Sequence, residues 1–480
     1  MSFQSVPFLV SLAISVALYS LLPQRWRSVF LACLSFAFYL TWSLPYTLLL
    51  LLVTVYIFYL VQKLDEAEET RKYRILWQGV VLLVVLLVAG KYGREVLMSL
   101  PAIGLSSSIV NLVAPLGISY YVFKLLSYLM DVYAGKLSAE HNLAAFAAYV
   151  SFFPQILAGP IQRAVDFLPQ IRAARQAQPY QLSSGLRLIL FGLFKKLVIA
   201  DALSALVAQI YKYPKGYTGF ELLITSYLFA IQLYADFSGI TDIAIGSARL
   251  FGISSPKNFE NPFYAPTIQE FWRRWHITLT SWVRDYVFLP IRMKFRYWGW
   301  VGLTLSIFIN MILIGLWHGA TSPFLWFGIV QGAYMVVSVF TLKKRDAIFA
   351  RIPGIPVFRL IWQSALTFTL VSLSLIFFRA ENLRMAASIL SSILSRSFFH
   401  LGIGRLLETI NLVWGDTRFV VVVLALVYME IIHLVQGNLK WRAYILSCPT
   451  ALRWLVYYAM ILILFFFGDQ SAKPFIYFQF

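Results

Sequence analysis

The sequence predicts an all-α protein that crosses a membrane many times. Hydrophobic residues occupy 60% of the 480 positions, charged residues only 13%, and the mean hydropathy is +0.74. A water-soluble domain averages about half apolar and about a quarter charged residues, so the apolar excess must face lipid. Because no repeat, low-complexity tract or soluble domain is visible, residues 1–480 are predicted to form a single membrane domain.

Apolar stretches of the length that crosses a bilayer recur along the chain and predict roughly 11–13 transmembrane helices. They lie at 7–22, 29–45, 47–61, 75–90, 109–133, 184–210, 218–235, 300–316, 324–341, 358–378, 417–436 and 454–467. Two further segments, 143–160 and 239–252, are shorter or interrupted by proline or glycine, and we expect them to be re-entrant. The first stretch lacks a basic n-region and a cleavage site, so we expect it to be retained.

The charge pattern predicts the orientation of these helices. The formal net charge is +19, and the basic residues lie in short loops, where they orient the chain and meet anionic lipid headgroups. Arg25 and Arg27 follow the first stretch, and Lys343 to Arg345 mark a later basic loop. Positive loops stay cytoplasmic, so both ends of the sequence are predicted to lie outside the cytoplasmic (inner) membrane, although loop 379–405 is basic and is left external. No nucleic-acid partner is expected.

The residues exclude several kinds of site. Cys33 and Cys448 lie in different hydrophobic stretches without ligand spacing, so neither a metal site nor a disulfide is expected. The sequence has no G-x-S-x-G nucleophile elbow, no P-loop and no H-E-x-x-H motif. The remaining histidines, at 141, 400 and 433, have no supporting neighbours in the sequence and are assigned no role.

The segment NPFYAPTIQEFWRRWHITLTSWVRDYVFLP holds His276 in an amphipathic, aromatic-rich pattern. Its apolar positions recur every three or four residues, which predicts one helix that lies at the interface or dips into the helix bundle. These positions are Trp272, Trp275, Leu279, Trp282 and Tyr286. Membrane anchoring alone explains the periodicity, and a functional site for His276 is the alternative.

His318 stands at the end of a strongly apolar stretch, NMILIGLWHGATSPFLWFG. Gly315 and Gly319 flank it, and glycine permits close backbone approach or a break in the helix. Asn310, eight residues earlier, and the break at Pro323 indicate a polar cavity within the membrane. A satisfied residue at a helix end is one interpretation, and a general base is the other, because the pKa of histidine lies near neutrality.

A third polar cluster lies in YADFSGITDIAIGSARLFG, with Asp236, Ser238, Asp242 and Arg249. Ionisable groups at membrane depth are costly and usually face a cavity or each other. The cluster therefore indicates either a tunnel that meets substrate or a structural lock between aspartate and arginine or backbone.

The histidine segments resemble the membrane-bound O-acyltransferase family. The resemblance is carried by RRWHITLTSWVRDYVFLPI and, some forty residues on, by GLWHGA. Four further segments resemble the alginate O-acetyltransferase branch: PLGISYYVFKLLSYLMDVY, YVSFFPQILAGPIQR, QLYADFSGITDIAIGSARLFG and the closing FIYFQF. The resemblance covers roughly residues 110–330 and the last six residues, 475–480. The sequence departs from that branch at 292–300, where RMKFRYWGW replaces a Gly-Gly-Asn-Arg stretch.

The resemblance implies a ring of transmembrane helices around a central tunnel, through which an acetyl group passes from acetyl-coenzyme A. His318 matches the catalytic histidine of the family, and His276 matches its second motif histidine. Trp317, Trp275 and the polar residues named above are then candidates for lining the tunnel or meeting the donor. The acceptor would be an extracytoplasmic polysaccharide, reached through a separate serine-hydrolase-like (SGNH-type) acetyltransferase partner.

The last six residues have two interpretations. By pattern they are an aromatic anchor at the membrane interface. By resemblance, Tyr477 carries the acetyl group briefly before the partner collects it. Two other functions compete with acyl transfer as a whole: a transporter or flippase of an acyl donor or lipid-linked sugar, and a membrane scaffold whose tail recruits a polysaccharide-modifying enzyme.

Overall fold

The computed structural model describes residues 2–99, 117–173, 175–350, 356–395, 402–437, 448–469 and 475–476. These residues are helical or lie in turns and loops between helices. They divide into two compact units, Met1–Ile189 with Ile240–Lys257, and Leu190–Gly239 with Asn258–Phe480. The division falls inside two helices, α10 (Pro179–Phe194) and α12 (Gly219–Leu250), so each of them contributes residues to both units.

Eight helices of the described part are long and apolar enough to cross a membrane, which makes the protein a multi-pass membrane protein. They are Leu44–Asp65, Glu69–Gly93, Gly219–Leu250, Arg296–His318, Ser322–Phe349, Val357–Arg379, Ile403–Val435 and Thr450–Phe467. The sequence predicted roughly 11–13. Part of the predicted stretch 109–133 lies outside the described residues, and the other differences arise where apolar stretches form shorter or divided helices.

The predicted stretches 7–22 and 29–45 form α1 (Val6–Leu21) and α2 (Gln24–Leu40), of 16 and 17 residues. The stretch 184–210 is divided by a π-helical turn, Lys195–Ala200, between α10 and α11 (Asp201–Lys212). The re-entrant segment expected at 239–252 is not separate, because it continues α12 without a break. The segment near 143–160 is indeed short and interrupted, forming α7 (Leu143–Ser151) and α8 (Phe153–Ile156).

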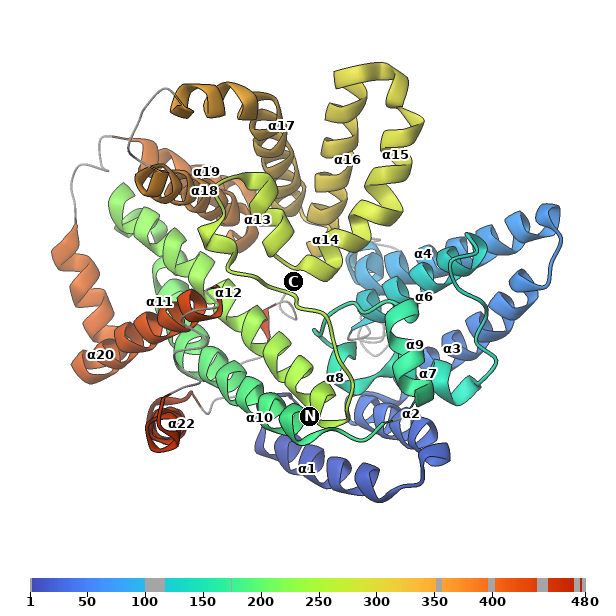
Figure 1. The fold of residues 1–480 in the computed structure, drawn as a ribbon. Helices are drawn as coiled ribbons and strands as arrows, with labels where there is room; N and C mark the ends of the chain where they lie inside the picture. Colours follow the sequence, from blue (N-terminus) through green and yellow to red (C-terminus); the bar gives the residue numbers. More distant parts are fainter. Residues whose placement is uncertain are drawn as a thin grey trace. The chain divides into compact units, whose positions relative to one another are not determined.

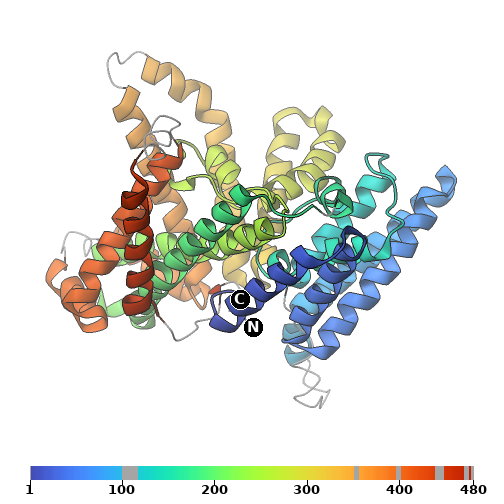
Figure 2. The same ribbon diagram turned by 60° about the horizontal axis from the view of Figure 1, so that its bottom comes forward.

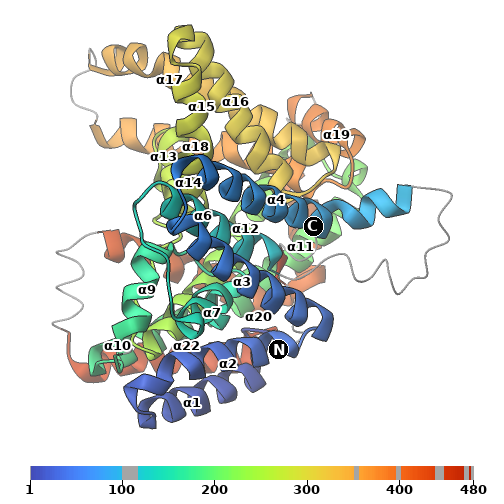
Figure 3. The same cartoon turned by 90° about the vertical axis from the view of Figure 1, so that its right-hand side faces the viewer.

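The first unit packs its helices around α6 (Ile118–Tyr133). Nearly every side chain of α6 is buried, and a helix that is apolar on all sides belongs in a protein core. The long helices α3 (Leu44–Asp65) and α4 (Glu69–Ser99) both pack against it and lie side by side (Figures 2 and 3). They enclose a groove of about 890 Å³ lined by Lys63, Arg71 and Arg74. The short helix α9 (Ala164–Ala173) packs on α6 and α7.

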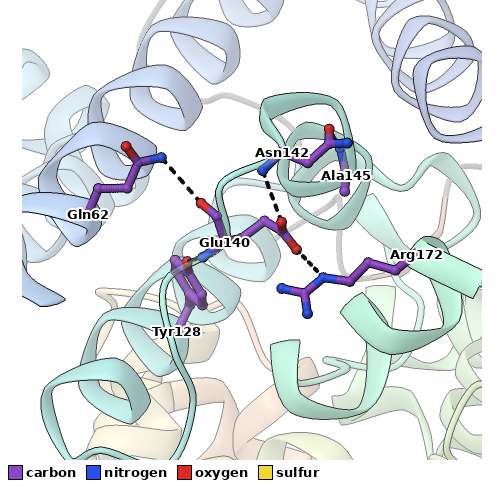
Figure 4. A network of polar contacts seen from close by, with 6 residues as sticks. All are labelled: Gln62, Tyr128, Glu140, Asn142, Ala145 and Arg172. Atoms are coloured by element: carbon purple, nitrogen blue, oxygen red, sulfur yellow. Dashed lines mark hydrogen bonds and ion pairs between the residues drawn. The ribbon is translucent and has the colours of Figure 1, made fainter.

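The loop between α6 and α7 is fixed by Glu140, whose backbone and side chain both take part (Figure 4). Its N–H donates to the Tyr128 hydroxyl at 2.7 Å, and its carbonyl accepts from Gln62. Its buried carboxylate accepts from the Asn142 N–H at 2.9 Å and pairs with Arg172 at 2.8 Å. The Arg172 side chain is half exposed, so the ion pair itself contributes little, and the buried hydrogen bonds contribute more.

The second unit contains the close pair α16 (Gly299–His318) and α17 (Ser322–Ala350), which lie side by side (Figure 1). Glycine permits this approach: a Cβ at Gly315 would lie 2.4 Å from the Phe324 carbonyl oxygen, and one at Gly328 would lie 2.7 Å from the Met311 carbonyl oxygen. Helix α18 (Pro356–Arg379) packs on α17, and α19 (Leu383–Leu394) packs on α18. Helix α20 (Ile403–Gly437) bends at Gly415 and, like α22 (Thr450–Phe467), contacts the π-helical turn.

Replacing Glu140 with alanine should lower the free energy of unfolding by about 1–3 kcal/mol, because the Asn142 N–H loses its buried acceptor. The measurement is an SDS titration of the purified protein followed by circular dichroism. Glu66→Ala is the matched control, since Glu66 is exposed, and it should change stability by less than about 0.5 kcal/mol. Equal effects of the two substitutions would contradict the role assigned to Glu140.

Candidate functional site

His276 stands at a break between two short helices, α13 (Ile268–Arg274) and α14 (Ile277–Val283). Its backbone is left-handed, with φ 43°, a conformation that non-glycine residues rarely adopt. Two backbone hydrogen bonds bracket the break. The Glu260 N–H donates to the Arg274 carbonyl at 3.0 Å, and the Ile277 N–H donates to the Asn258 carbonyl at 2.9 Å. A strained residue held on both sides is typical of a functional site.

The Asn258 side chain fixes the protonation of the His276 ring. Its Oδ1 accepts from the Thr278 N–H at 3.3 Å and from the Thr278 hydroxyl at 2.9 Å, which identifies it as the amide oxygen. The same oxygen lies 3.0 Å from His276 Nδ1. An oxygen only accepts here, so Nδ1 carries the proton and Nε2 keeps its lone pair.

The Nε2 atom of His276 is buried and has no hydrogen-bond partner within the described residues. His276 lies outside the eight candidate spans, and burial lowers the pKa of its imidazole to about 3. The ring is therefore a neutral hydrogen-bond acceptor at physiological pH, available to a donor group of a substrate.

The prediction of one continuous amphipathic helix around His276 is wrong. Helix α13 ends before the break, and α14 begins after it. A π-helical turn, Arg284–Phe288, then separates α14 from α15 (Leu289–Lys294). The predicted face is largely buried in protein: Trp272, Trp275, Leu279 and Trp282 are each less than a tenth exposed. The Trp272 indole N–H donates to Gln331 of α17 at 3.1 Å. The segment thus belongs to the helix bundle, which favours the site over the simple anchor.

His318 is the last residue of α16, and its ring is 6% exposed. Aromatic rings surround it. The centroids of Trp317 and Phe378 lie 4.7 and 4.8 Å away, and those of Phe327 and Phe324 lie 6.1 and 6.3 Å away. The ring is thus held in a mainly apolar environment. The tunnel predicted to reach it stays a prediction.

Trp317 connects the two histidines. Its ring centroid lies 5.9 Å from that of His276 and 4.7 Å from that of His318, so the three rings form one row. Trp275 has a different role, since it stacks on Phe271 at 5.5 Å in an aromatic cluster. Asn310 shares α16 with His318 but lies about 12 Å away along the helix axis, at 1.5 Å per residue.

The third predicted cluster is divided by the fold. Asp236 and Ser238 lie in the second unit, where their partners are lysines: Lys196 pairs with Asp236 at 3.0 Å, and Lys195 donates to the Ser238 hydroxyl at 3.0 Å. Asp236 thus pairs with a lysine, and its second oxygen accepts from the backbone N–H of Ile476, which is the backbone alternative of the predicted lock. Asp242 and Arg249 lie on the part of α12 that belongs to the first unit.

Residues 475–476 lie in the same region. The ring of Phe475 lies 5.4 Å from that of Phe237, and the Phe237 ring lies 4.7 Å from His276. The Ile476 N–H donates to Asp236. Tyr477, the predicted carrier, lies outside the described residues.

Four residues were missed from the sequence. Asn258 stands in an irregular loop, where no spacing singles it out. Lys196 and Asp201 interrupt an otherwise apolar stretch, and that was a usable signal, because intramembrane charges usually mark a pair or a site. His433 was assigned no role, yet in the structure its Nε2 lies 3.0 Å from the Tyr234 hydroxyl and its Nδ1 lies 3.5 Å from Glu430.

The described residues contain no group of three His, Cys, Asp or Glu side chains that could hold a metal ion. The geometry defines a class of protein: a multi-pass membrane protein that buries two histidines beside one tryptophan, one of them with a fixed proton and an available lone pair.

Comparison with known proteins identifies the family. The profile of the membrane-bound O-acyltransferase family matches residues 33–378. A probable alginate O-acetylase of Pseudomonas syringae pv. tomato is 33% identical over 403 residues, which is 82% of this chain and 75% of that protein. The chain belongs to the membrane-bound O-acyltransferase family, and it is an O-acyltransferase.

Two relatives whose names give other activities also match. A peptidoglycan O-acetyltransferase of Helicobacter pylori is 32% identical over 408 residues, covering 77% of this chain and 73% of that protein. A teichoic acid D-alanyltransferase of Bacillus subtilis is 31% identical over 236 residues, covering 47% of this chain and 59% of that protein. The relatives therefore share acyl transfer but differ in acceptor and in acyl group.

The buried, neutral His276 should make stability depend on pH. The pKa of His276 is lowered in the folded protein, so below pH 6.5 the unfolded chain binds a proton that the folded chain does not. The free energy of unfolding therefore decreases as the pH is lowered. Between pH 6.5 and 5 the loss should be about 2 kcal/mol. The measurement compares SDS unfolding of the wild type and His276→Gln across this range. If the variant loses as much stability as the wild type, the assignment is wrong.

Proposed function

We propose that this enzyme moves an acetyl group from acetyl-coenzyme A on the cytoplasmic side towards an extracytoplasmic polysaccharide. The activities named for the alginate and peptidoglycan relatives support acetyl as the acyl group and a polysaccharide as the acceptor. Coenzyme A carries phosphates, which cross hydrocarbon only at high cost, so a passage that admits its pantetheine arm is needed. The observation that carries the proposal is the row of His276, Trp317 and His318 inside the second unit.

In this proposal His318 is the general base. It takes the proton of a hydroxyl group, the resulting oxygen attacks the thioester carbonyl, and the carbon–sulfur bond breaks. The coenzyme A thiolate leaves and receives the proton from the imidazolium of His318. Backbone amides near Gly319 stabilise the oxyanion. We do not assign that role to Asn310, because α16 places it about two turns of helix from His318.

His276 receives a different role. Asn258 keeps its proton on Nδ1, so the lone pair on Nε2 is directed away from that contact and can accept a hydrogen bond. We assign it to holding the donor or the attacking hydroxyl beside Trp317. A base that protonates during the reaction would be disfavoured at this position, because burial lowers the pKa of His276 to about 3.

Tyr477 is the proposed first acceptor. Its phenol would take the acetyl group as an ester and pass it to a separate extracytoplasmic acetyltransferase of the SGNH type. This requires the end of the sequence to lie outside the inner membrane, the orientation that the charge pattern predicts.

His318→Ala should lower acetyl transfer by about 10²–10⁴-fold, the usual contribution of a general base. The measurement is transfer of radiolabel from acetyl-coenzyme A to the protein or to an added partner. His141→Ala is the control, because His141 is exposed, and it should transfer at the wild-type rate. A transporter or a scaffold would show no label that depends on His318, and that result would overturn the proposal.

Tyr477→Phe should fold normally, because it removes only one oxygen, and should abolish labelling of the protein itself. The label is located by proteolysis and mass spectrometry of the segment 475–480. Phe478→Leu serves as the matched control, since it changes an aromatic side chain of the same segment without removing a hydroxyl. Unchanged export of acetyl groups by Tyr477→Phe would show that the relay is not used.

A further inference from the structure

A buried cluster of three charges lies beside the histidine row. The Lys196 ammonium lies 2.9 Å from Asp201 and 3.0 Å from Asp236, and all three side chains are less than a tenth exposed. Two carboxylates share one ammonium. Burying charged groups is costly unless hydrogen bonds satisfy them. Each further hydrogen-bond donor to the cluster therefore stabilises it.

Ile476 supplies one such donor. The Asp236 carboxylate uses Oδ1 for Lys196 and Oδ2 for the backbone N–H of Ile476, at 2.9 Å. Phe475 and Ile476 are themselves buried, at 4% and 5% exposure, although the segment is distant from Asp236 in the sequence. A hydrogen bond to an ionised carboxylate is about twice as strong as one between neutral groups. This hydrogen bond thus links the Asp236 carboxylate to residues 475–476, which we call the tail.

Phe237 sets where the tail is held. Its ring lies 5.4 Å from Phe475 on one side and 4.7 Å from His276 on the other. Phe237, which contacts His276, is thus the next residue after Asp236 in α12. Holding the tail at Ile476 therefore places it next to the row that ends at His318.

We propose that Asp236, positioned by Lys196 and Asp201, is a binding site for residues 475–476 of the same chain and that it thereby positions Tyr477 for acyl transfer. Tyr477 is bonded to Ile476, and consecutive Cα atoms are about 3.8 Å apart, so the hydrogen bond lies one peptide from the proposed acceptor. The contact uses only the backbone N–H of Ile476. The positioning role rests on the proposed relay, whereas the binding of the tail does not.

The test removes either partner of the hydrogen bond in the full-length protein. Ile476→Pro deletes the N–H and leaves the three charges unaltered, and Asp236→Ala deletes the acceptor. Asp236→Asn keeps an acceptor oxygen, and Ile476→Val keeps the N–H and is the matched control. Each substitution is made in a Cys33→Ser, Cys448→Ser, Gln479→Cys background, so that a maleimide reports how accessible the tail is.

Ile476→Pro and Asp236→Ala should each raise the alkylation rate at least about tenfold over Ile476→Val, a factor equal to 1.4 kcal/mol. The double variant should react no faster than the faster single variant, because both changes remove one interaction. Asp236→Asn should lie between. Rates within twofold of the control for both single variants would overturn the binding site, and Ile476→Pro gives this answer even where Asp236→Ala fails to fold.

Acetyl transfer separates the two claims. Ile476→Pro should lower kcat about tenfold and leave KM for acetyl-coenzyme A unchanged, since the donor side is untouched. A released tail with unchanged kcat would overturn the positioning role and leave the binding site standing. Tyr477→Phe keeps the Ile476 N–H, so its alkylation stays slow whether or not the relay is used, and its transfer activity alone decides the relay.

Discussion

The candidate site depends on the hydrogen bonds between Asn258 and the residues of the helix break at His276. One residue supplies a carbonyl to the Ile277 N–H and an amide oxygen to His276 and Thr278. Without these contacts the break would leave backbone groups unpaired in an apolar protein, where each unpaired group costs several kcal/mol. The same contacts that make the break possible also fix the histidine tautomer. Backbone geometry and acid–base chemistry are thus set by one residue.

The break gives His276 two aromatic neighbours that come from distant parts of the chain. Phe237 of α12 meets it on one side and Trp317 of α16 meets it on another. Through them the ring row extends from Phe475 to His318, entirely within the second unit. Aromatic rings are rigid and exclude water, which suits a site where a thioester must survive until the acceptor arrives.

A charged cluster lies beside the ring row. Lys196, Asp201 and Asp236 form two buried ion pairs there. Relatives that act on alginate, peptidoglycan and teichoic acid share the family with this chain but differ in what they modify.

The amino-acid sequence alone predicted a multi-pass membrane protein. It also indicated His276 and His318 as the first candidates for the functional site. Composition and local apolar length decide these features, because lipid exposure is a property of each segment. The tertiary structure decided which residues meet. It broke the predicted helix at His276, continued α12 as far as Leu250, and brought Lys196 and the Ile476 N–H to Asp236. Such contacts join residues up to 240 positions apart, and periodicity along the chain carries no information about them.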